Sequence, residues 1–337
     1  MAPLDARGAP VHMRAPMSFA ELLPPPVLFF ALGFAAAALR SDLAVPDALA
    51  KALSLYLMMA IGLKGGIAVA QPGAAAAMLP ALALGIGLSA LMPVPAYALL
   101  RAGTGLDRAT AAAVSAHYGS VSVVTFAAAA GQLDAAGIAY EGFMPAVLAA
   151  METPAILTAL LLARRGGEAT SGGPRELAHE VLLNGSVVLL LGAFAIGWLG
   201  GAGAERQLGP FIGALFPGAL CLFLLEMGLT AARRLRDRGR GLDRRLVGFA
   251  IVMPLLGGAA GLGAGLLAGL SLGGVGLMAV LGASASYIAV PAAMRMALPA
   301  ADAGIYVTLS LAVTFPFNIL AGIPLWLWAA RAASGGA

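Results

Sequence analysis

Residues 113–126 read Ala-Val-Ser-Ala-His-Tyr-Gly-Ser-Val-Ser-Val-Val-Thr-Phe, which places polar side chains in the middle of an otherwise apolar segment. Residues 281–291, Leu-Gly-Ala-Ser-Ala-Ser-Tyr-Ile-Ala-Val-Pro, form a second interruption of the same kind. Aligned without a gap, the two stretches place Ser120 on Ser284 and Ser122 on Ser286. Such groups are costly inside a bilayer unless they line a cavity, because lipid offers the backbone no hydrogen-bond partners. The matched pair therefore predicts a binding site near the bilayer midplane, as in secondary transporters.

The composition independently predicts an integral membrane protein. Hydrophobic residues make up 61% of the chain and charged residues 11%, and the mean hydropathy of +0.92 is far above that of soluble domains. No basic run is interleaved with aromatic residues, so the net charge of +4 reflects loop topology and no nucleic-acid partner is expected. A single cysteine, Cys221, excludes a disulfide within the chain, and with three histidines we expect no transition-metal site.

The chain divides into ten apolar segments of roughly membrane-spanning length. We expect spans at 25–39, 47–69, 75–100, 108–131, 142–163, 179–200, 208–231, 245–269, 273–297 and 303–330. Short connections are expected at 71–73, 101–106, 132–141, 201–207 and 298–302. Residues 1–24 are expected to be a flexible tail without the apolar core of a signal peptide, and Met13 or Met17 is an alternative start.

Two five-span halves follow from the position of the most polar connection. We expect a first repeat at 25–163, a cytoplasmic linker at 164–178 and a second repeat at 179–331. Because five is an odd number, the second half must enter the membrane from the opposite side, which is an inverted repeat. Further matches support the alignment: Gly62 falls on Gly228, and Pro154 on Pro316.

The basic residues predict the orientation in the membrane. With the N-terminus outside, fifteen of the twenty Lys and Arg residues fall in one set of loops and four in the other, while Lys64 lies within a span. Cytoplasmic loops carry the excess of basic residues, so we expect both termini outside and the linker inside. We also expect Lys64 to pair with Glu226 as a structural contact.

The two interruptions supply candidates for binding a small anion. Helices that begin at a break direct unpaired N–H groups and the positive end of the helix dipole into the cavity, and serine hydroxyls add neutral donors. No arginine lies at either break, so the anion should be small and weakly held. The predicted substrate-binding residues are Gly119, Ser120, Val121, Ser122, Ser284, Ala285, Ser286 and Tyr287.

Oxygen-bearing residues in the fifth and tenth spans are candidates for binding sodium. Pro154 and Pro316 remove backbone donors and free the carbonyls of Ala150 and Ala312. An acid within a span, such as Glu152, is functional by default. The predicted sodium-binding residues are Thr125, Glu152, Thr153, Thr314 and Asn318. The competing interpretation is structural: serines commonly bond within or between helices, and His117 is more often a packing residue than a proton relay.

The order of these motifs resembles the sodium-dependent bicarbonate transporters of cyanobacteria and their wider bacterial relatives. The resemblance rests on HYGSVSVVTF at 117–126, Tyr140-Glu141, METPAILTALLLAR at 151–164 and SASYIAVPAAMR at 284–295, and it covers Pro25 to Arg331. It implies an all-α membrane protein of ten transmembrane helices in a 5+5 inverted repeat, with two crossed, broken helices and with core and gate domains.

The resemblance also implies a function and partners. It implies symport of bicarbonate with Na⁺ as the coupling ion and no other cofactor, a homotrimer in the bacterial inner membrane and a PII-like cytoplasmic regulator. Tyr287 stands where the cyanobacterial members typically have an aspartate, and the linker is much shorter than theirs. The carried anion and the regulator are therefore open.

Three classes of function are compatible with the sequence to different degrees. The first is a sodium-coupled symporter of bicarbonate or a small carboxylate. The second is a sodium/proton antiporter, which needs an acid at the crossing; neither break contains one, although Glu152 lies elsewhere in a span. The third is a membrane enzyme using His117 with Ser115 or Ser120, but no third residue orients the histidine, so we expect no enzyme.

Overall fold

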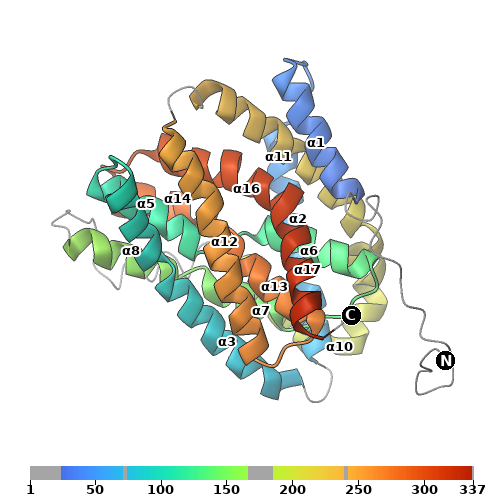
Figure 1. Ribbon diagram of the computed structural model, residues 1–337. Helices are drawn as coiled ribbons and strands as arrows, with labels where there is room; N and C mark the ends of the chain where they lie inside the picture. Colours follow the sequence, from blue (N-terminus) through green and yellow to red (C-terminus); the bar gives the residue numbers. More distant parts are fainter. Residues whose placement is uncertain (1–23, 71–73, 166–184, 239–241, 336–337) are drawn as a thin grey trace, which may run out of the picture.

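The computed structural model describes residues 24–70, 74–165, 185–238 and 242–335, and within these ranges the chain contains helices and no strand (Figure 1). The predicted tail, except for Pro24, lies outside the described residues. The predicted linker lies outside them as well, except for Arg164 and Arg165. The sixth predicted span is described from Gly185 onward.

The helices of the first half follow the predicted spans, several of which are divided. They are α1 (Pro25–Ala38), α2 (Asp47–Val69), α3 (Ala74–Leu91), α4 (Pro93–Gly103), α5 (Arg108–Gly119), α6 (Val123–Ala135), α7 (Met144–Met151) and α8 (Pro154–Arg165). Pro93 and Pro154 each stand at the first residue of a helix, where the missing N–H costs nothing. Proline thus sets two of the three divisions, and the polar residues after Gly119 set the third.

The described helices of the second half lie between Gly185 and Ala333. They are α10 (Gly185–Gly209), η1 (Pro210–Ala214), α11 (Phe216–Arg238), α12 (Arg244–Leu267), α13 (Leu272–Ala283), α14 (Ala289–Ala297), α15 (Ala303–Val307), η3 (Thr308–Thr314), α16 (Phe315–Phe317), η4 (Asn318–Gly322) and α17 (Ile323–Ala333). The non-helical connection expected at 201–207 is wrong in extent. Gly201 alone leaves helical geometry, with φ 44° and ψ −132°, and helix resumes after it. A single glycine supplies this conformation without steric cost.

The helices are long and apolar enough for a protein that crosses a membrane several times. Within the described ranges, seven helical segments meet this criterion, and the longest of them, Val188–Asp237, has 50 residues and includes the turn at Gly201. Pro25–Ala38 and Leu272–Ala283 are apolar but shorter. Isolated apolar side chains such as Leu199 and Trp328 are exposed, as expected for a surface that faces lipid.

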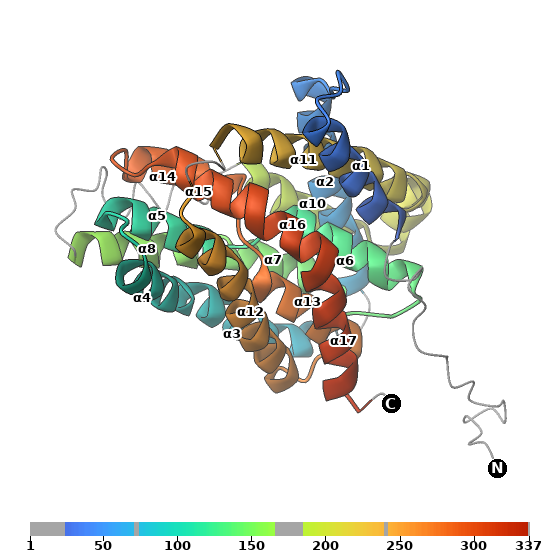
Figure 2. The same ribbon diagram turned by 45° about the horizontal axis from the view of Figure 1, so that its top comes forward.

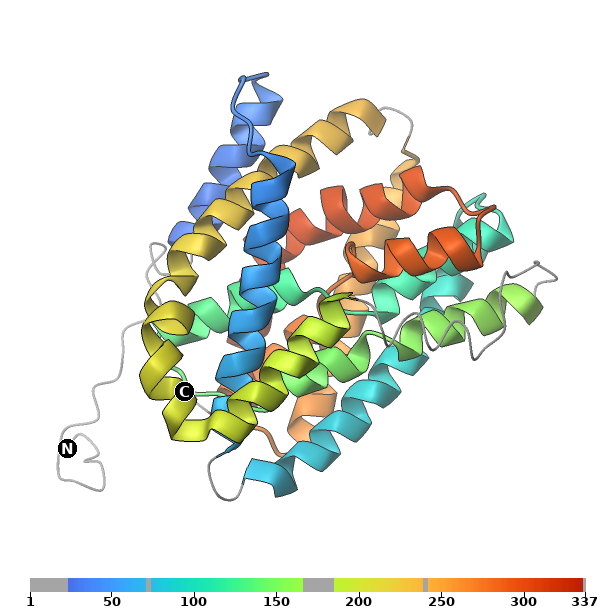
Figure 3. The same ribbon diagram turned by 180° about the vertical axis from the view of Figure 1, so that it is seen from behind.

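Four helices form one side of the molecule by packing in two pairs. α1 packs along α11 and α2 packs along α10 (Figures 1 and 3). Glycines permit both contacts: a Cβ at Gly228 would meet the carbonyl of Phe30, and one at Gly62 would meet the carbonyl of Leu190. Such close approach of backbones is the usual basis of helix association in membranes. Each pair joins a helix of the first half to a helix of the second.

The other helices surround the two that are broken. α13 contacts α6 and α14 contacts α5, so the α5–α6 and α13–α14 pairs run past each other in opposite directions (Figure 2). α8 packs against α5, and α17 packs against α13. α5 and α13 are buried except for the first residue of each helix. The two breaks are therefore held inside the protein.

Candidate binding site at the crossing of the broken helices

The first break lies between α5 and α6 and is made by its own polar residues. α5 ends at Gly119, and Ser120 has extended geometry, with φ −86° and ψ 174°. Ser122 begins the next helix as its N-cap, because its Oγ accepts a hydrogen bond from the N–H of Thr125 at 3.1 Å. Serine is a favoured N-cap residue, so the sequence itself ends one helix and starts another here. Gly119 packs closely against Pro93 and Ala155.

The second break, between α13 and α14, also begins with an extended serine but is longer, and no side chain caps the helix that follows it. α13 ends at Ala283, and Ser284 is extended, with φ −79° and ψ 162°. α14 begins at Ala289, with the Oγ of Ser286 3.5 Å from the N–H of Val290. Asn318 supports this break from η4 by donating a hydrogen bond to the carbonyl of Ala283 at 2.8 Å.

The two breaks are hydrogen-bonded directly to each other. The N–H of Ser122 donates to the Oγ of Ser284 at 3.0 Å, and the N–H of Ser286 donates to the carbonyl of His117 at 2.9 Å. The backbone groups freed by the breaks thus find partners across the crossing, as membrane-embedded irregular segments must. The two serine pairs that the sequence alignment matched thus lie against each other in the structure.

The serines of each pair have different hydrogen bonds. Ser120 donates to the carbonyl of Glu152 at 3.1 Å, and Ser284 donates to the carbonyl of Leu281 at 2.8 Å. Ser122 and Ser286 instead accept from N–H groups of the following helix. The first serine of each pair therefore donates to a backbone carbonyl, whereas the second serine accepts from the helix that follows the break.

A small buried cavity, here called the crossing cavity, lies where the breaks meet. It offers about 10 Å³ to the centre of a water-sized sphere, which is room for one water. Of the predicted residues, Val121, Ser122, Glu152, Ser286 and Tyr287 line it. Its other lining residues are Met58, Val123, Ile288 and Ala289. Met58 comes from α2, so the cavity lies between the crossing and the four-helix side of the molecule.

Glu152 brings an unpaired carboxyl group to the crossing cavity. The residue lies in the two-residue gap between α7 and α8, is 3% exposed, and its Oε2 has no hydrogen-bond partner among the described residues. The hydroxyl of Tyr287, which also lines the cavity, is likewise unpaired. The lining contains no Lys, Arg or His. A buried carboxylate without a cation requires either a proton or a bound cation.

The remaining sodium candidates lie near the crossing but do not line its cavity. Thr125 donates its hydroxyl proton to Ser122 at 3.0 Å. Thr314 donates to the carbonyl of Ala250 at 2.7 Å, so the hydroxyl of Tyr118, also at 2.7 Å, must be the donor in their contact. Asn318 keeps a buried, unpaired Oδ1. Thr153 lies beside Glu152 and is partly buried.

The two matched prolines have different surroundings. At Pro154 the helix is divided, and the nearby carbonyls of Met151 and Glu152 accept hydrogen bonds from Ser89 and Ser120. Pro316 lies instead in a continuous helical run between the wide turns η3 and η4. Such π-type turns occur frequently at functional sites. The predicted substrate residues Gly119, Ser120, Ser284 and Ala285 lie in or beside the breaks but do not line the crossing cavity.

The expected pair of Lys64 with Glu226 is wrong. Lys64 pairs with Asp134 of α6, its Nζ lying 3.2 Å from Oδ2. Glu226 accepts a hydrogen bond from Thr230 of its own helix at 2.6 Å. The two residues lie in corresponding predicted spans, but correspondence between repeats does not imply contact.

Met58, which lines the crossing cavity, could not be predicted, because nothing in the sequence near that residue distinguishes it from a lipid-facing methionine.

The chain also matches a model of a known protein family. The family model of the Na⁺-dependent bicarbonate transporter superfamily matches residues 25–331. The chain belongs to this superfamily. The match includes both serine pairs, both prolines and Lys64, so the resemblance inferred from the motifs is confirmed. No curated protein matches the chain. Membership of this superfamily, together with the apolar helices, identifies a multi-pass membrane protein of a transporter class.

Proposed function

We propose that the protein is a secondary active transporter that carries a small anion, with bicarbonate as the first candidate, together with Na⁺. The observation that carries this proposal is the crossing cavity, which combines the hydroxyls of Ser122 and Ser286 with the carboxyl of Glu152, whose Oε2 has no hydrogen-bond partner among the described residues. The hydroxyls and the N-termini of α6 and α14 suit an anion. The carboxyl suits a hard cation such as Na⁺.

The arrangement explains how two fluxes can be coupled. An anion beside an ionised Glu152 is repelled, because no basic side chain lines the cavity to offset the two negative charges. A sodium ion on the carboxylate removes this repulsion and leaves the anion a favourable partner. Each ion therefore raises the affinity for the other, which is the reciprocal coupling that symport requires. The cavity has room for one water, so a bound anion would require its lining residues, including Met58 of α2, to move apart.

We also propose ten crossings arranged as a 5+5 inverted repeat. The 50-residue segment Val188–Asp237 turns at Gly201 and can count as two crossings, and α1 and the α13–α14 pair supply the remaining two beyond the long segments. The exchanged packing of α1 on α11 and of α10 on α2 supports the repeat. These four helices correspond to a gate domain and the rest to a core domain.

Removing the second serine of each pair is expected to weaken anion binding selectively. Ser122→Ala or Ser286→Ala removes a donor to a charged ligand, worth roughly 1.5–3 kcal/mol. The KM for bicarbonate should rise about ten- to a hundredfold. Ser115→Ala is the matched control, because Ser115 is buried on α5, gives its hydroxyl proton to the carbonyl of Ala112 and does not line the crossing cavity. Radiolabelled uptake into proteoliposomes with an inward Na⁺ gradient measures all three variants. An unchanged KM in both Ser122→Ala and Ser286→Ala would show that these hydroxyls only shape the helices.

The orientation gives a second prediction. We propose that the protein lies in the bacterial inner membrane with both termini outside and the 164–178 linker in the cytoplasm. In a Cys221→Ala background, a cysteine at Arg165 should react with an impermeant maleimide only after the cells are opened. Ala135, the last residue of α6, is exposed and lies in the connection that this topology places outside. A cysteine at this position should react in intact cells. Labelling of the first site from outside would reverse the proposed topology.

A sodium/proton antiporter is the second candidate, and the unpaired carboxyl of Glu152 favours it. In that case Na⁺ and H⁺ would alternate on the carboxyl without any need for an anion.

A small carboxylate such as acetate is the alternative cargo for the symporter, and its ability to compete with the uptake of labelled bicarbonate tests this alternative. The homotrimer and the PII-like regulator stay predictions from the resemblance.

A further inference from the structure

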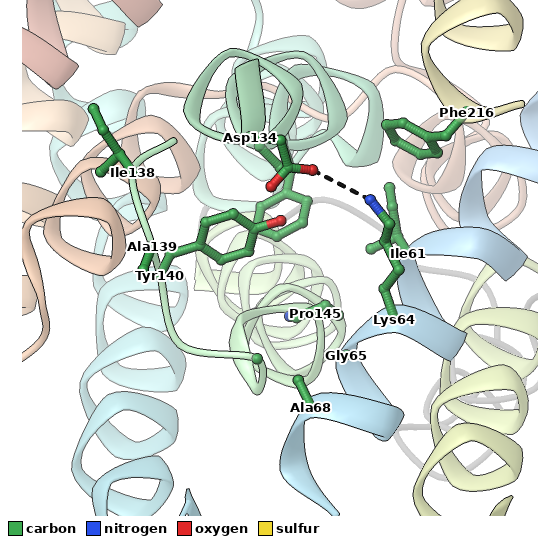
Figure 4. A pocket seen from close by; sticks show the side chains of 13 residues that line it. Ile61, Lys64, Gly65, Ala68, Asp134, Ile138, Ala139, Tyr140, Pro145 and Phe216 are labelled. Carbon is green, nitrogen blue, oxygen red and sulfur yellow. Dashed lines mark hydrogen bonds and ion pairs between the residues drawn. The ribbon is translucent and has the colours of Figure 1, made fainter. Parts of the chain in front are cut away.

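A second and much larger cavity, here called the side cavity, lies between α2, the C-terminal half of α6, the segment before α7, and α11. It has a volume of about 290 Å³, whereas the crossing cavity has room for one water. Lys64, Asp134, Tyr140 and Phe216 line it, and their side chains converge in Figure 4. In the conformation described, the side cavity is thus the larger space and has room for a small polyatomic anion with water.

The charged groups of the side cavity form a pair that is easily opened. Lys64 is the single cationic residue among those lining the cavity, and it lies 3.2 Å from Asp134 and 5.0 Å from the centre of the Phe216 ring. Its side chain is 33% exposed and that of Asp134 is 45% exposed. Ion pairs with this much exposure contribute little to stability, so another anion can replace Asp134 as the partner of Lys64.

Tyr140 supplies a neutral donor in the same space. Its ring points toward Asp134 in Figure 4. Burial, the charge of Asp134 and a hydrogen bond to Asp134 raise the pKa of Tyr140, so its phenol keeps its proton. Asp134 is thus the shared partner of Lys64 and Tyr140, and an anion that replaces Asp134 would meet an ammonium group and a hydroxyl, which is a suitable donor set for a monovalent oxyanion.

The side cavity and the crossing cavity lie along the same seam between α2 and α6. Met58 and Val123 line the crossing cavity, while Ile61 and Phe126, each three residues further along its helix, line the side cavity. Three helical residues span about 4.5 Å along the axis. Ile61 and Phe126 are 4% and 1% exposed, so they fill the short distance between the two cavities.

We propose that the side cavity is a second anion-binding site, in which Lys64 exchanges Asp134 for a small monovalent oxyanion such as bicarbonate or acetate. The site lies directly before the crossing cavity on the α2–α6 seam. Its place in a transport route rests on the proposed function, whereas anion binding at Lys64 does not. Lys64 also lies inside the predicted span 47–69, away from both of its ends, and ionisable residues in such positions are functional by default.

Opposite effects of removing each member of the pair test this proposal. Lys64→Met and Asp134→Asn both abolish the ion pair, so a merely structural role predicts the same change in both. Anion binding at Lys64 predicts that Lys64→Met raises the KM for bicarbonate about tenfold or more, that Asp134→Asn lowers it, and that Lys64→Arg restores the wild-type value. Lys51→Met is the matched control, because Lys51 is exposed on the same helix and lines neither cavity.

A binding measurement separates this proposal from the transport function. In a Ser122→Ala/Ser286→Ala background, the rise in melting temperature with bicarbonate or acetate, relative to gluconate, reports residual binding at the side cavity. We expect this rise to disappear with Lys64→Met and to occur at lower anion concentration with Asp134→Asn. If anions raise the melting temperatures of the two variants equally, the side cavity is not an anion site. If Lys64→Met fails to fold, the test is Asp134→Asn alone, and an anion dependence equal to that of the Ser122→Ala/Ser286→Ala background overturns the site. A wild type that binds anions but transports none overturns the proposed function alone.

Discussion

Glu152→Gln is expected to abolish the stimulation of anion uptake by Na⁺. The substitution keeps the shape of the side chain and one carbonyl oxygen but removes the negative charge from the wall of the crossing cavity. A cation at roughly 4 Å from a carboxylate gains about 4 kcal/mol at an effective dielectric constant of 20. Loss of even half of this energy raises the Na⁺ concentration for half-maximal uptake about thirtyfold. Initial rates measured over a range of Na⁺ concentrations at constant ionic strength give this value.

Glu226→Gln is the matched control, because Glu226 is a second acid within a long apolar helix. Its carboxyl bonds to Thr230 and does not line the crossing cavity, so its Na⁺ dependence should be that of the wild type. Wild-type uptake that is indifferent to replacement of Na⁺ by K⁺ but is driven by a pH gradient would make Glu152 a proton carrier. The sodium assignment would then be abandoned in favour of proton coupling.

The breaks could be predicted from sequence because their cause is local. Serine after an apolar helix ends one hydrogen-bond ladder and caps the next, and this is visible in the Ser120 and Ser122 pair without any tertiary information. The gapless alignment with Ser284 and Ser286 adds the expectation that the two breaks meet. The first feature depends on residues that are adjacent in the chain and the second on a comparison of two distant stretches, and the structure has both.

The composition of the site could not be predicted to the same extent. Met58 lines the crossing cavity because α2 passes beside it, which is a tertiary fact without a local sequence pattern. The partner of Lys64 is Asp134, seventy residues away, and matching positions in the two halves indicated Glu226 instead. The different hydrogen bonds of the two serines in each pair could not be predicted either, because they depend on which hydroxyl lies near a backbone carbonyl in the folded protein.

The fold itself gives the prediction with the largest effect on stability: Gly62→Leu and Gly228→Leu are each expected to prevent correct folding. The two glycines hold corresponding places in the predicted repeats. A Cβ at Gly62 would meet the backbone of Leu190 and Phe194, and one at Gly228 would meet the backbone of Phe30 and Phe34. Overpacking in a core costs roughly 1–3 kcal/mol when side chains can adjust, and a clash with another helix's backbone costs more because rotamer changes cannot relieve it.

Gly192→Leu on α10 and Gly218→Leu on α11 provide matched controls, because a Cβ at either position meets nothing within 4 Å and both glycines are exposed. Size-exclusion profiles in detergent and melting temperatures should show loss of the folded peak for Gly62→Leu and Gly228→Leu and a near-normal peak for the controls. The two core variants should fail together, because each separates one of the two exchanged helix pairs, α2 from α10 or α1 from α11. A normal melting temperature for Gly228→Leu beside a collapsed Gly62→Leu would mean that the two pairs are not equivalent, and the inverted repeat would lose its main structural support.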